Sequence, residues 1–74
     1  MINVRDEKYL RALGKSLRFH RLRKGITQEV LAENCGIGKN QVGLIERGQV
    51  NLTVCTLKVL SKQLNVSIKE ILDF

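Results

Sequence analysis

Hydrophobic residues recur at spacings of three and four along most of this chain, a periodicity that predicts helices rather than strands. The first such stretch covers residues 6–24 and ends before Gly25, and glycine commonly follows the last residue of a helix. One side of this helix is mainly apolar and carries Tyr9, Leu10, Leu13, Leu17, His20 and Arg21. The opposite side is basic and carries Lys8, Arg11, Lys15 and Arg18. The stretch is therefore expected to be an amphipathic helix with one face on the core.

Two shorter helices follow the first. Thr27 is placed to cap a helix over residues 28–35, which ends at Gly36, where we expect the backbone to take a positive φ. The next helix is expected over residues 39–47 and is closed by a glycine. Their core positions are Leu31, Ala32 and Cys35 in one helix and Val42 and Ile45 in the other. Only three residues join the two helices, and so short a link predicts the sharp crossing of a helix-turn-helix over residues 27–47.

The C-terminal part of the chain, residues 53–74, predicts two more helices. Thr53 is placed to cap the longer helix, and Ser67 begins a Ser-x-x-Glu capping box for the shorter one. Their apolar positions are Val54, Leu57, Leu60 and Leu64 in the longer helix and Ile68, Ile71 and Leu72 in the shorter one. No segment alternates between apolar and polar residues over the length of a strand. We therefore expect residues 1–74 to form one all-α domain of five helices.

Basic residues are concentrated at one end of the chain. The net charge is +6, and residues 1–24 contain eight basic and two acidic residues, whereas residues 25–74 contain five of each. A basic domain of this kind is typical of proteins that bind a polyanion, most often a nucleic acid. Composition alone leaves open the alternative of a basic surface without any ligand.

Several motifs resemble landmarks of one family of DNA-binding proteins. The segment TQEVLAENCGI at residues 27–37 is similar to the second helix and turn of the phage repressor and Cro family, also called the Xre family. QVGLIERG at residues 41–48 resembles the end of that family's recognition helix, and LNVSI at residues 64–68 resembles the link before its last helix. Residues 13–18 and Arg21 fit as well, and the resemblance runs without gaps to Leu72. It implies the five-helix, lambda-repressor-like fold and a sequence-specific, DNA-binding regulator of transcription.

Four positions depart from that family's pattern. His20 stands where the family has an aliphatic residue, and we expect it to be half-buried in the packing of the first helix. Gly38 replaces the Ser or Thr that caps the recognition helix. Gly43 lies inside that helix, where glycine costs about 1 kcal/mol relative to alanine, so either a need for space or close approach to DNA explains it. Leu52 replaces a proline, and this variant resembles the controller proteins of restriction–modification systems.

The start of the recognition helix meets base edges in the major groove in this fold, and the resemblance implies the same role here. Lys39, Asn40 and Gln41 occupy these positions. Lysine can reach guanine acceptors, and asparagine or glutamine can bind adenine through two hydrogen bonds. Leu44 lies one turn further on, where we expect contact with a thymine methyl group.

Other polar residues are expected to hold the DNA backbone without reading its sequence. The resemblance implies that Gln28, in the first turn of its helix, holds a phosphate and braces Lys39, since the helix dipole favours an anion there. A second phosphate clamp is expected at the end of the recognition helix. The predicted phosphate-binding residues are Gln28, Arg47, Gln49 and Asn51, with Lys15 and Arg18 from the basic helix. Arg21 and Glu46 match a structural ion pair that ties the family's first helix to its recognition helix.

One recognition helix contacts too few base pairs to select an operator from a genome, so we expect a homodimer on double-stranded DNA. Its half-sites would lie about 34–36 Å apart, one turn of DNA. Leu72 and Phe74 have no evident internal partner in the sequence pattern. We expect them to form the dimer interface together with Val50 and Leu52, which precede the fourth helix.

Other functions find less support in the sequence. The chain has one histidine and neither a catalytic triad nor a phosphate loop, so it is not expected to be an enzyme. The main alternative is a protein-interaction role, chiefly that of an antitoxin that binds its own operator, which exposed Phe19 and Leu22 would support. RNA binding is disfavoured because only 4% of the residues are aromatic and no stacking surface is evident.

Cysteine use and hydropathy indicate where the chain resides. Cys35 and Cys55 form no Cys-x-x-Cys pair, and with a single histidine they predict neither a metal site nor a cofactor. Two reduced, structural cysteines are expected rather than a disulfide, although the sequence alone leaves a single disulfide between them as an alternative. No run of apolar residues is long enough to span a membrane, and no signal segment is evident. We therefore expect a cytoplasmic protein without a membrane or small-molecule partner.

Overall fold

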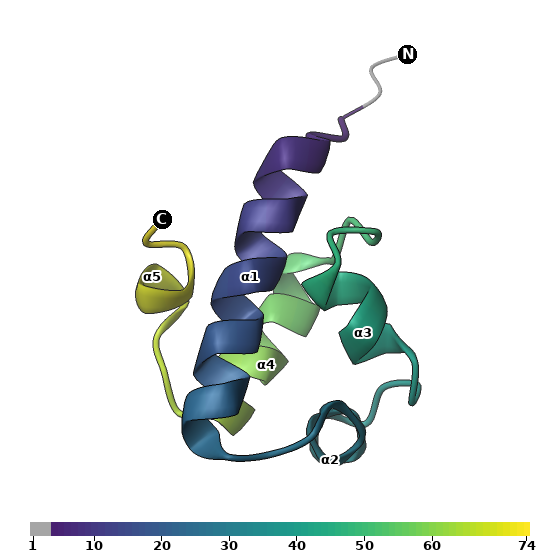
Figure 1. Ribbon diagram of the computed structural model, residues 1–74, viewed down its shortest axis with the longest axis vertical. Helices are drawn as coiled ribbons and strands as arrows, with labels where there is room; N and C mark the ends of the chain where they lie inside the picture. Colours follow the sequence, from purple (N-terminus) through teal and green to yellow (C-terminus); the bar gives the residue numbers. More distant parts are fainter. Residues whose placement is uncertain (1–3) are drawn as a thin grey trace.

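A computed structural model describes residues 4–74 as five helices without a strand, which confirms the predicted all-α fold. The helices are α1 (Glu7–Lys24), α2 (Gln28–Cys35), α3 (Gln41–Glu46), α4 (Val54–Leu64) and α5 (Ile68–Ile71). The long α1 runs through the length of the molecule, with α2 and α3 on one side of it and α5 on the other (Figure 1). α4 lies behind α1 in this view. None of the helices described between residues 4 and 74 is long and apolar enough to cross a membrane.

Side-chain caps fix where four of the helices begin. Each capping side chain accepts a hydrogen bond from the backbone N–H three residues further on; the caps are Asp6, Thr27, Thr53 and Ser67. Gly36 ends α2 with a φ of 69°, a conformation that glycine adopts without steric cost. The predicted N-caps of the second, fourth and fifth helices and the predicted positive φ at Gly36 are therefore confirmed.

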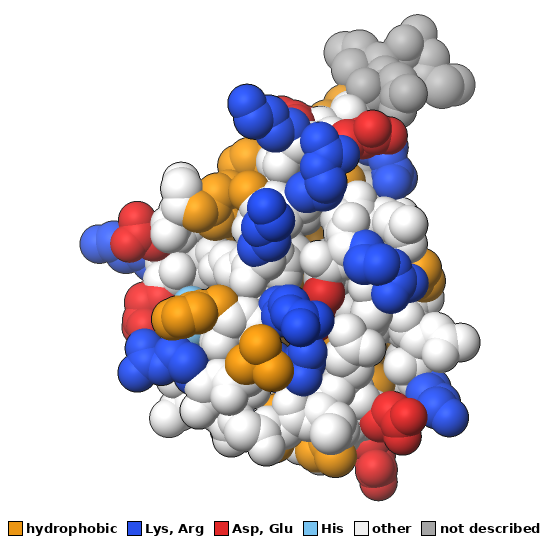
Figure 2. Space-filling model, viewed as in Figure 1, with side chains coloured by type: hydrophobic (Ala, Val, Ile, Leu, Met, Phe, Trp, Pro, Cys, Tyr) orange, Lys and Arg blue, Asp and Glu red, His pale blue; other side chains and the backbone are white. Residues whose placement is uncertain are grey.

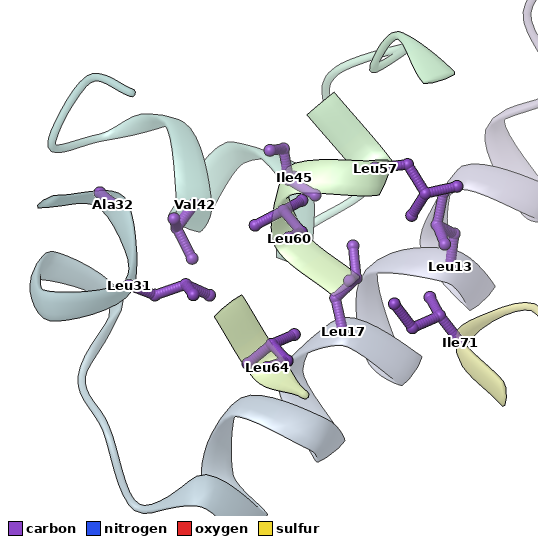
Figure 3. Packing of buried hydrophobic residues seen from close by; sticks show 10 residues of the cluster. All are labelled: Leu13, Leu17, Leu31, Ala32, Val42, Ile45, Leu57, Leu60, Leu64 and Ile71. Atoms are coloured by element: carbon purple, nitrogen blue, oxygen red, sulfur yellow. The ribbon is translucent and has the colours of Figure 1, made fainter. Parts of the chain in front are cut away.

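The hydrophobic core is a single cluster to which all five helices contribute (Figure 3). Its buried members are Leu13 and Leu17 of α1, Leu31 and Ala32 of α2, Val42 and Ile45 of α3, Leu57, Leu60 and Leu64 of α4, and Ile71 of α5. Tyr9 and Val54 were expected on apolar faces, but they are 47% and 77% exposed. Both lie in the first turn of their helix; the first buried residue of α1 is the next one, Leu10, and that of α4 is Leu57, about one turn after Val54.

The two cysteines differ in their surroundings, and both are free thiols. Cys35 is half-buried against the core, and this burial raises the pKa of its thiol. Cys55 is exposed on α4, so the expectation of a structural role is wrong for this residue. The helical period explains the difference, because Leu57 and Leu60 mark the buried face of α4 and Cys55 lies outside it.

Two glycines allow α1 to lie directly on the C-terminal end of α3. A Cβ atom at Gly14 of α1 would overlap the backbone carbonyl oxygens of Ile45 and Glu46. A Cβ atom at Gly48, just after α3, would lie 2.7 Å from the backbone nitrogen of Arg11. Such overlaps with backbone atoms cannot be relieved by rotating a side chain. The position of α3 is thus set by backbone contact with α1.

Candidate nucleic-acid interface

The recognition helix is shorter than the sequence pattern predicted. α3 begins at Gln41 rather than Lys39 and ends at Glu46. The backbone N–H of Gln41 donates to the carbonyl of Gly38 at 3.0 Å, so that Lys39 and Asn40 form a turn before the helix. Asn40 occupies the N-cap position but makes no side-chain cap hydrogen bond, and Gly38 has no side chain to provide one. The missing cap explains the late start.

Three of the four residues predicted to contact bases border hollows of the surface. Lys39, Asn40 and Gln41 are exposed, and Leu44 is half-buried one turn further along α3. Lys39 and Asn40 border a hollow of about 170 Å³ that Gln28, Glu29, Gly43 and Arg47 also line. Gln41 borders a different hollow, of about 390 Å³, between the start of α3 and the α3–α4 loop. The structure therefore groups Lys39 and Asn40 with two predicted phosphate-binding residues and separates Gln41 from them.

Gln28 lies in the first turn of α2, but it does not brace Lys39 as expected. Its Nε2 atom donates to Oε1 of Glu46 at 3.0 Å. Nζ of Lys39 lies 3.9 Å from Oε1 of Glu29, and both of these side chains are more than two thirds exposed. Each of the two side chains thus has a carboxylate partner, and no hydrogen bond joins them within the described residues. An ion pair as exposed as that of Lys39 and Glu29 contributes little to stability, so Lys39 is free to leave it.

Arg21 and Glu46 form a buried ion pair between α1 and the last residue of α3, as the sequence predicted. Nε of Arg21 donates to Oε2 of Glu46 at 2.6 Å, and Nη2 donates to Oε1 at 3.0 Å. Nη1 of Arg21 donates to the carbonyl of Ile26 at 2.9 Å, so the guanidinium is held on three sides. The two side chains are 7% and 3% exposed. A bidentate contact of this kind fixes orientation as well as distance, and it aligns α3 on α1.

The predicted clamp at the end of α3 is partly engaged within the protein. Nε of Arg47 donates to Oε1 of Gln49 at 3.2 Å. Nδ2 of Asn51 donates to the carbonyl of Val4 at 3.0 Å, and Nη2 of Arg5 donates to the carbonyl of Gln49 at 3.1 Å. Gln49 and Asn51 therefore fasten the start of the chain to the α3–α4 loop. Sequence reasoning missed Arg5, because it precedes the first helix and belongs to no periodic pattern.

A basic surface extends over α1 beside the helix-turn-helix. The predicted basic side of α1 is exposed along its length; it consists of Lys8, Arg11, Lys15 and Arg18. Figure 2 shows Lys and Arg side chains in a row along α1, with further basic side chains over α3 on the same face. Nη1 of Arg18 also lies 4.0 Å from Oε1 of Glu46. One face of the molecule thus combines the basic row with the start of the recognition helix.

The residues predicted for a dimer interface lie on two sides of α1. Val50 and Leu52 belong to the α3–α4 loop, and Figure 1 places the C-terminus, with Leu72 and Phe74, on the other side of α1. Leu72 is half-buried against the core, and the rings of Phe74 and Tyr9 are 5.1 Å apart between centroids. The expectation that Leu72 and Phe74 lack an internal partner is therefore wrong. The reason is that α5 packs beside α1 and brings the C-terminus to its first turns.

A tight turn between two helices, an exposed start of the second helix and an adjoining basic face define a DNA-binding protein of the helix-turn-helix class. Residues 17–71 match the helix-turn-helix family, and the chain belongs to this family. It is a DNA-binding regulator of transcription, as the sequence predicted, and the family is not one of enzymes.

Several relatives are controller proteins or transcription factors. The chain is 37% identical over 60 residues to the control protein C.SmaI of Serratia marcescens, and this alignment covers 81% of this chain and 71% of that protein. It is 34% identical over 68 residues to a hypothetical transcription factor of Neisseria meningitidis, and this alignment covers 90% of this chain and 64% of that protein. The crystal structure of the restriction-modification controller protein C.AhdI from Aeromonas hydrophila matches with a TM-score of 0.80 and 33% identity, over 86% of this chain and 96% of that chain. The predicted resemblance to controller proteins is thus confirmed.

Proposed function

We propose that this regulator places the start of α3 in the major groove of an operator, where Lys39, Asn40, Gln41 and Leu44 contact base edges. The observation that carries this proposal is that exposed hydrogen-bonding side chains stand at the start of a helix whose position is fixed by buried contacts with α1. A fixed helix is needed because the contacts that distinguish one base pair from another depend on geometry. The controller proteins among its relatives support a role in the control of a restriction–modification system.

Selection of bound duplexes from a random DNA library tests this function. We expect enrichment of one motif, because the side chains at the start of α3 distinguish base pairs by their major-groove edges. Lys69→Ala on α5 is the matched control, since it removes an exposed lysine outside both the proposed DNA contacts and the proposed dimer surface and should select the same motif. If wild-type protein enriched no common sequence, the proposal of sequence-specific recognition would be wrong.

We also propose that the DNA backbone is contacted by Gln28, Arg47, Lys15 and Arg18. Gln28 and Arg47 line the same hollow as Lys39 and Asn40, and Lys15 and Arg18 are exposed on the basic side of α1. Three of these four residues are cations, which would release counterions from DNA. Gln49 and Asn51 act more indirectly in this proposal, since their side chains already bind Arg47 and the carbonyl of Val4.

We further propose a homodimer that uses the α3–α4 loop and the start of α4. A two-fold interface requires a single self-complementary patch, and the predicted residues lie on two sides of α1. On the loop side, Val54 is 77% exposed beside half-buried Val50 and Leu52. On the C-terminal side, Phe74 already packs against Tyr9.

Val54→Glu is therefore expected to convert the dimer to a folded monomer. A carboxylate at the centre of an apolar interface would be desolvated without a partner, which raises the dissociation constant about 100-fold or more. Sedimentation velocity at micromolar concentration measures the change, and Phe74→Glu is the matched control that should stay dimeric. A wild-type protein that sedimented as a monomer both alone and on its selected duplex would contradict the homodimer.

A further inference from the structure

Two predicted phosphate-binding residues, Gln28 of α2 and Arg47 just after α3, meet at Gly43, the glycine inside the recognition helix. We infer that Gln28 and Arg47 hold one and the same DNA phosphate, and that Gly43 provides the space in which they do so. We call this place the Gly43 seat; it consists of Gln28, Gly43 and Arg47. The inference rests on the proposed function. It adds that the two residues contact one phosphate together, whereas the sequence predicted two separate phosphate contacts.

The geometry brings the two side chains to one point. A Cβ atom built on Gly43 would lie 3.2 Å from Nη1 of Arg47 and 3.3 Å from Oε1 of Gln28. Gln28 belongs to the first turn of α2, whereas Arg47 follows the last residue of α3. The side chain of Arg47 thus turns back along α3 toward α2 instead of extending beyond the end of the helix. The hollow around them has a volume of about 170 Å³ and is also lined by Lys39 and Asn40.

The seat retains hydrogen-bond donors for an anion. Nε of Arg47 is engaged by Gln49, and within residues 4–74 its Nη groups donate no hydrogen bond. Nε2 of Gln28 uses one of its two N–H groups on Glu46 and keeps the second for another acceptor, while its Oε1, the atom nearest Gly43, has to turn away from a bound anion. Paired guanidinium N–H groups match the oxygens of a phosphate, and the N-terminus of α2 adds the positive end of its dipole.

The charges around the seat favour an anion. Glu46 touches Gln28, but its carboxylate is neutralised by the bidentate contact with Arg21. Glu29 at the rim lies 3.9 Å from Nζ of Lys39. The charged residues of the seat and its immediate contacts are Arg18, Arg21, Lys39 and Arg47 against Glu29 and Glu46, an excess of two positive charges. A phosphate would therefore enter a positive environment from which the acidic groups do not repel it.

The backbone gives Gly43 no other reason to be glycine. Its φ is not among the positive values found at Gly25, Gly36 and Gly48, so any residue could adopt its conformation. Alanine would favour the helix more than glycine does. Of the two explanations that the sequence left open, space and close approach to DNA, the structure favours space, because what a Cβ atom would meet is the pair of side chains in the seat.

Substitution at the seat gives opposite effects on folding and on DNA binding. Gly43→Ala is expected to keep or raise the urea midpoint of unfolding, while its Cβ atom displaces the ends of the Arg47 and Gln28 side chains by a few tenths of an ångström. Its affinity for the selected duplex should fall several-fold, and the slope of log K against log salt should become shallower by up to about 0.9, the value for one phosphate. In a background that carries both Gln28→Ala and Arg47→Ala, the same substitution should change affinity little, because both groups that it displaces are absent. Wild-type affinity and salt slope for Gly43→Ala would overturn the role of Gly43.

Replacing single phosphates by uncharged methylphosphonates tests whether Gln28 and Arg47 contact the same phosphate. The selected duplex is prepared with a single methylphosphonate at each backbone position in turn. We expect one position per half-site at which neutralisation weakens wild-type binding about tenfold and has little further effect on either Gln28→Ala or Arg47→Ala. If the affinity of Gln28→Ala were insensitive to a methylphosphonate at one position and that of Arg47→Ala at another, the two residues would hold separate phosphates and the inference would be overturned. That result leaves the selected motif intact, whereas failure of the proposed function would appear earlier, as the absence of any motif.

Discussion

Replacement of Glu46 by alanine is expected to lower the free energy of unfolding by about 3–5 kcal/mol. The substitution removes the carboxylate that accepts two hydrogen bonds from Arg21, whose side chain is 7% exposed. The guanidinium would stay buried with the carbonyl of Ile26 as its remaining partner. Small domains have stabilities near the low end of about 5–15 kcal/mol, so this loss removes most of the folding free energy. Urea denaturation followed by circular dichroism measures it.

Two controls separate the buried charge from the lost contact. The double variant Arg21→Met with Glu46→Leu should be more stable than Glu46→Ala alone, because both charges leave the interior together. Glu29→Ala breaks the exposed pair with Lys39 and should change stability by no more than about 1 kcal/mol. Equal urea midpoints for Glu46→Ala and Glu29→Ala would show that the buried pair does not hold α3 on α1.

The triple substitution of Lys39, Asn40 and Gln41 by alanine is expected to abolish sequence preference without unfolding the protein. All three side chains are exposed, and none belongs to the core cluster. Each good bidentate contact with a base contributes about 1–3 kcal/mol of discrimination, so the loss of two lowers the preference for the selected duplex by roughly 30- to 10⁴-fold. Competition between the selected duplex and a random-sequence duplex measures this ratio.

The single variants refine that result. Gln41→Ala should relax the motif at one base position, because Gln41 borders its own hollow apart from Lys39 and Asn40. Binding to a random-sequence duplex should fall only modestly in the triple variant, since one cation is lost and Arg18 and Arg47 stay in place. Enrichment of the same motif by the triple variant and by wild type would place base recognition elsewhere on the molecule.

Local signals in the sequence were sufficient for most of the fold. Thr27, Thr53 and Ser67 cap helices where the pattern placed them, because a capping side chain acts within three residues of itself. The recognition helix was predicted two residues too long at its start because the family pattern includes a cap that Gly38 cannot supply. The helix therefore begins where the local backbone allows it, at Gln41, and not where the family pattern predicted.

Contacts between distant segments were harder to anticipate. The resemblance identified the Arg21–Glu46 pair, but nothing in the chain indicated that Phe74 would meet Tyr9, since no local rule relates the two ends. The Gly43 seat combines both kinds of information. Arg47 lies four residues after Gly43, one turn along the helix, and this spacing was visible in the sequence. The approach of Gln28 depends on how α2 crosses α3, which the sequence did not specify.

The contacts that fasten the start of the chain to the α3–α4 loop bear on the layout of the operator itself. Arg5 donates to the carbonyl of Gln49, Asn51 donates to the carbonyl of Val4, and Gly48 lies against the backbone of Arg11. We therefore expect the loop to be stiff where it joins the proposed dimer surface to the recognition helix. Each base pair inserted between two half-sites rotates one of them by about 34–36° relative to the other. A stiff junction cannot follow that rotation. Operators of this regulator should therefore accept changes of sequence in the spacer but not changes of its length.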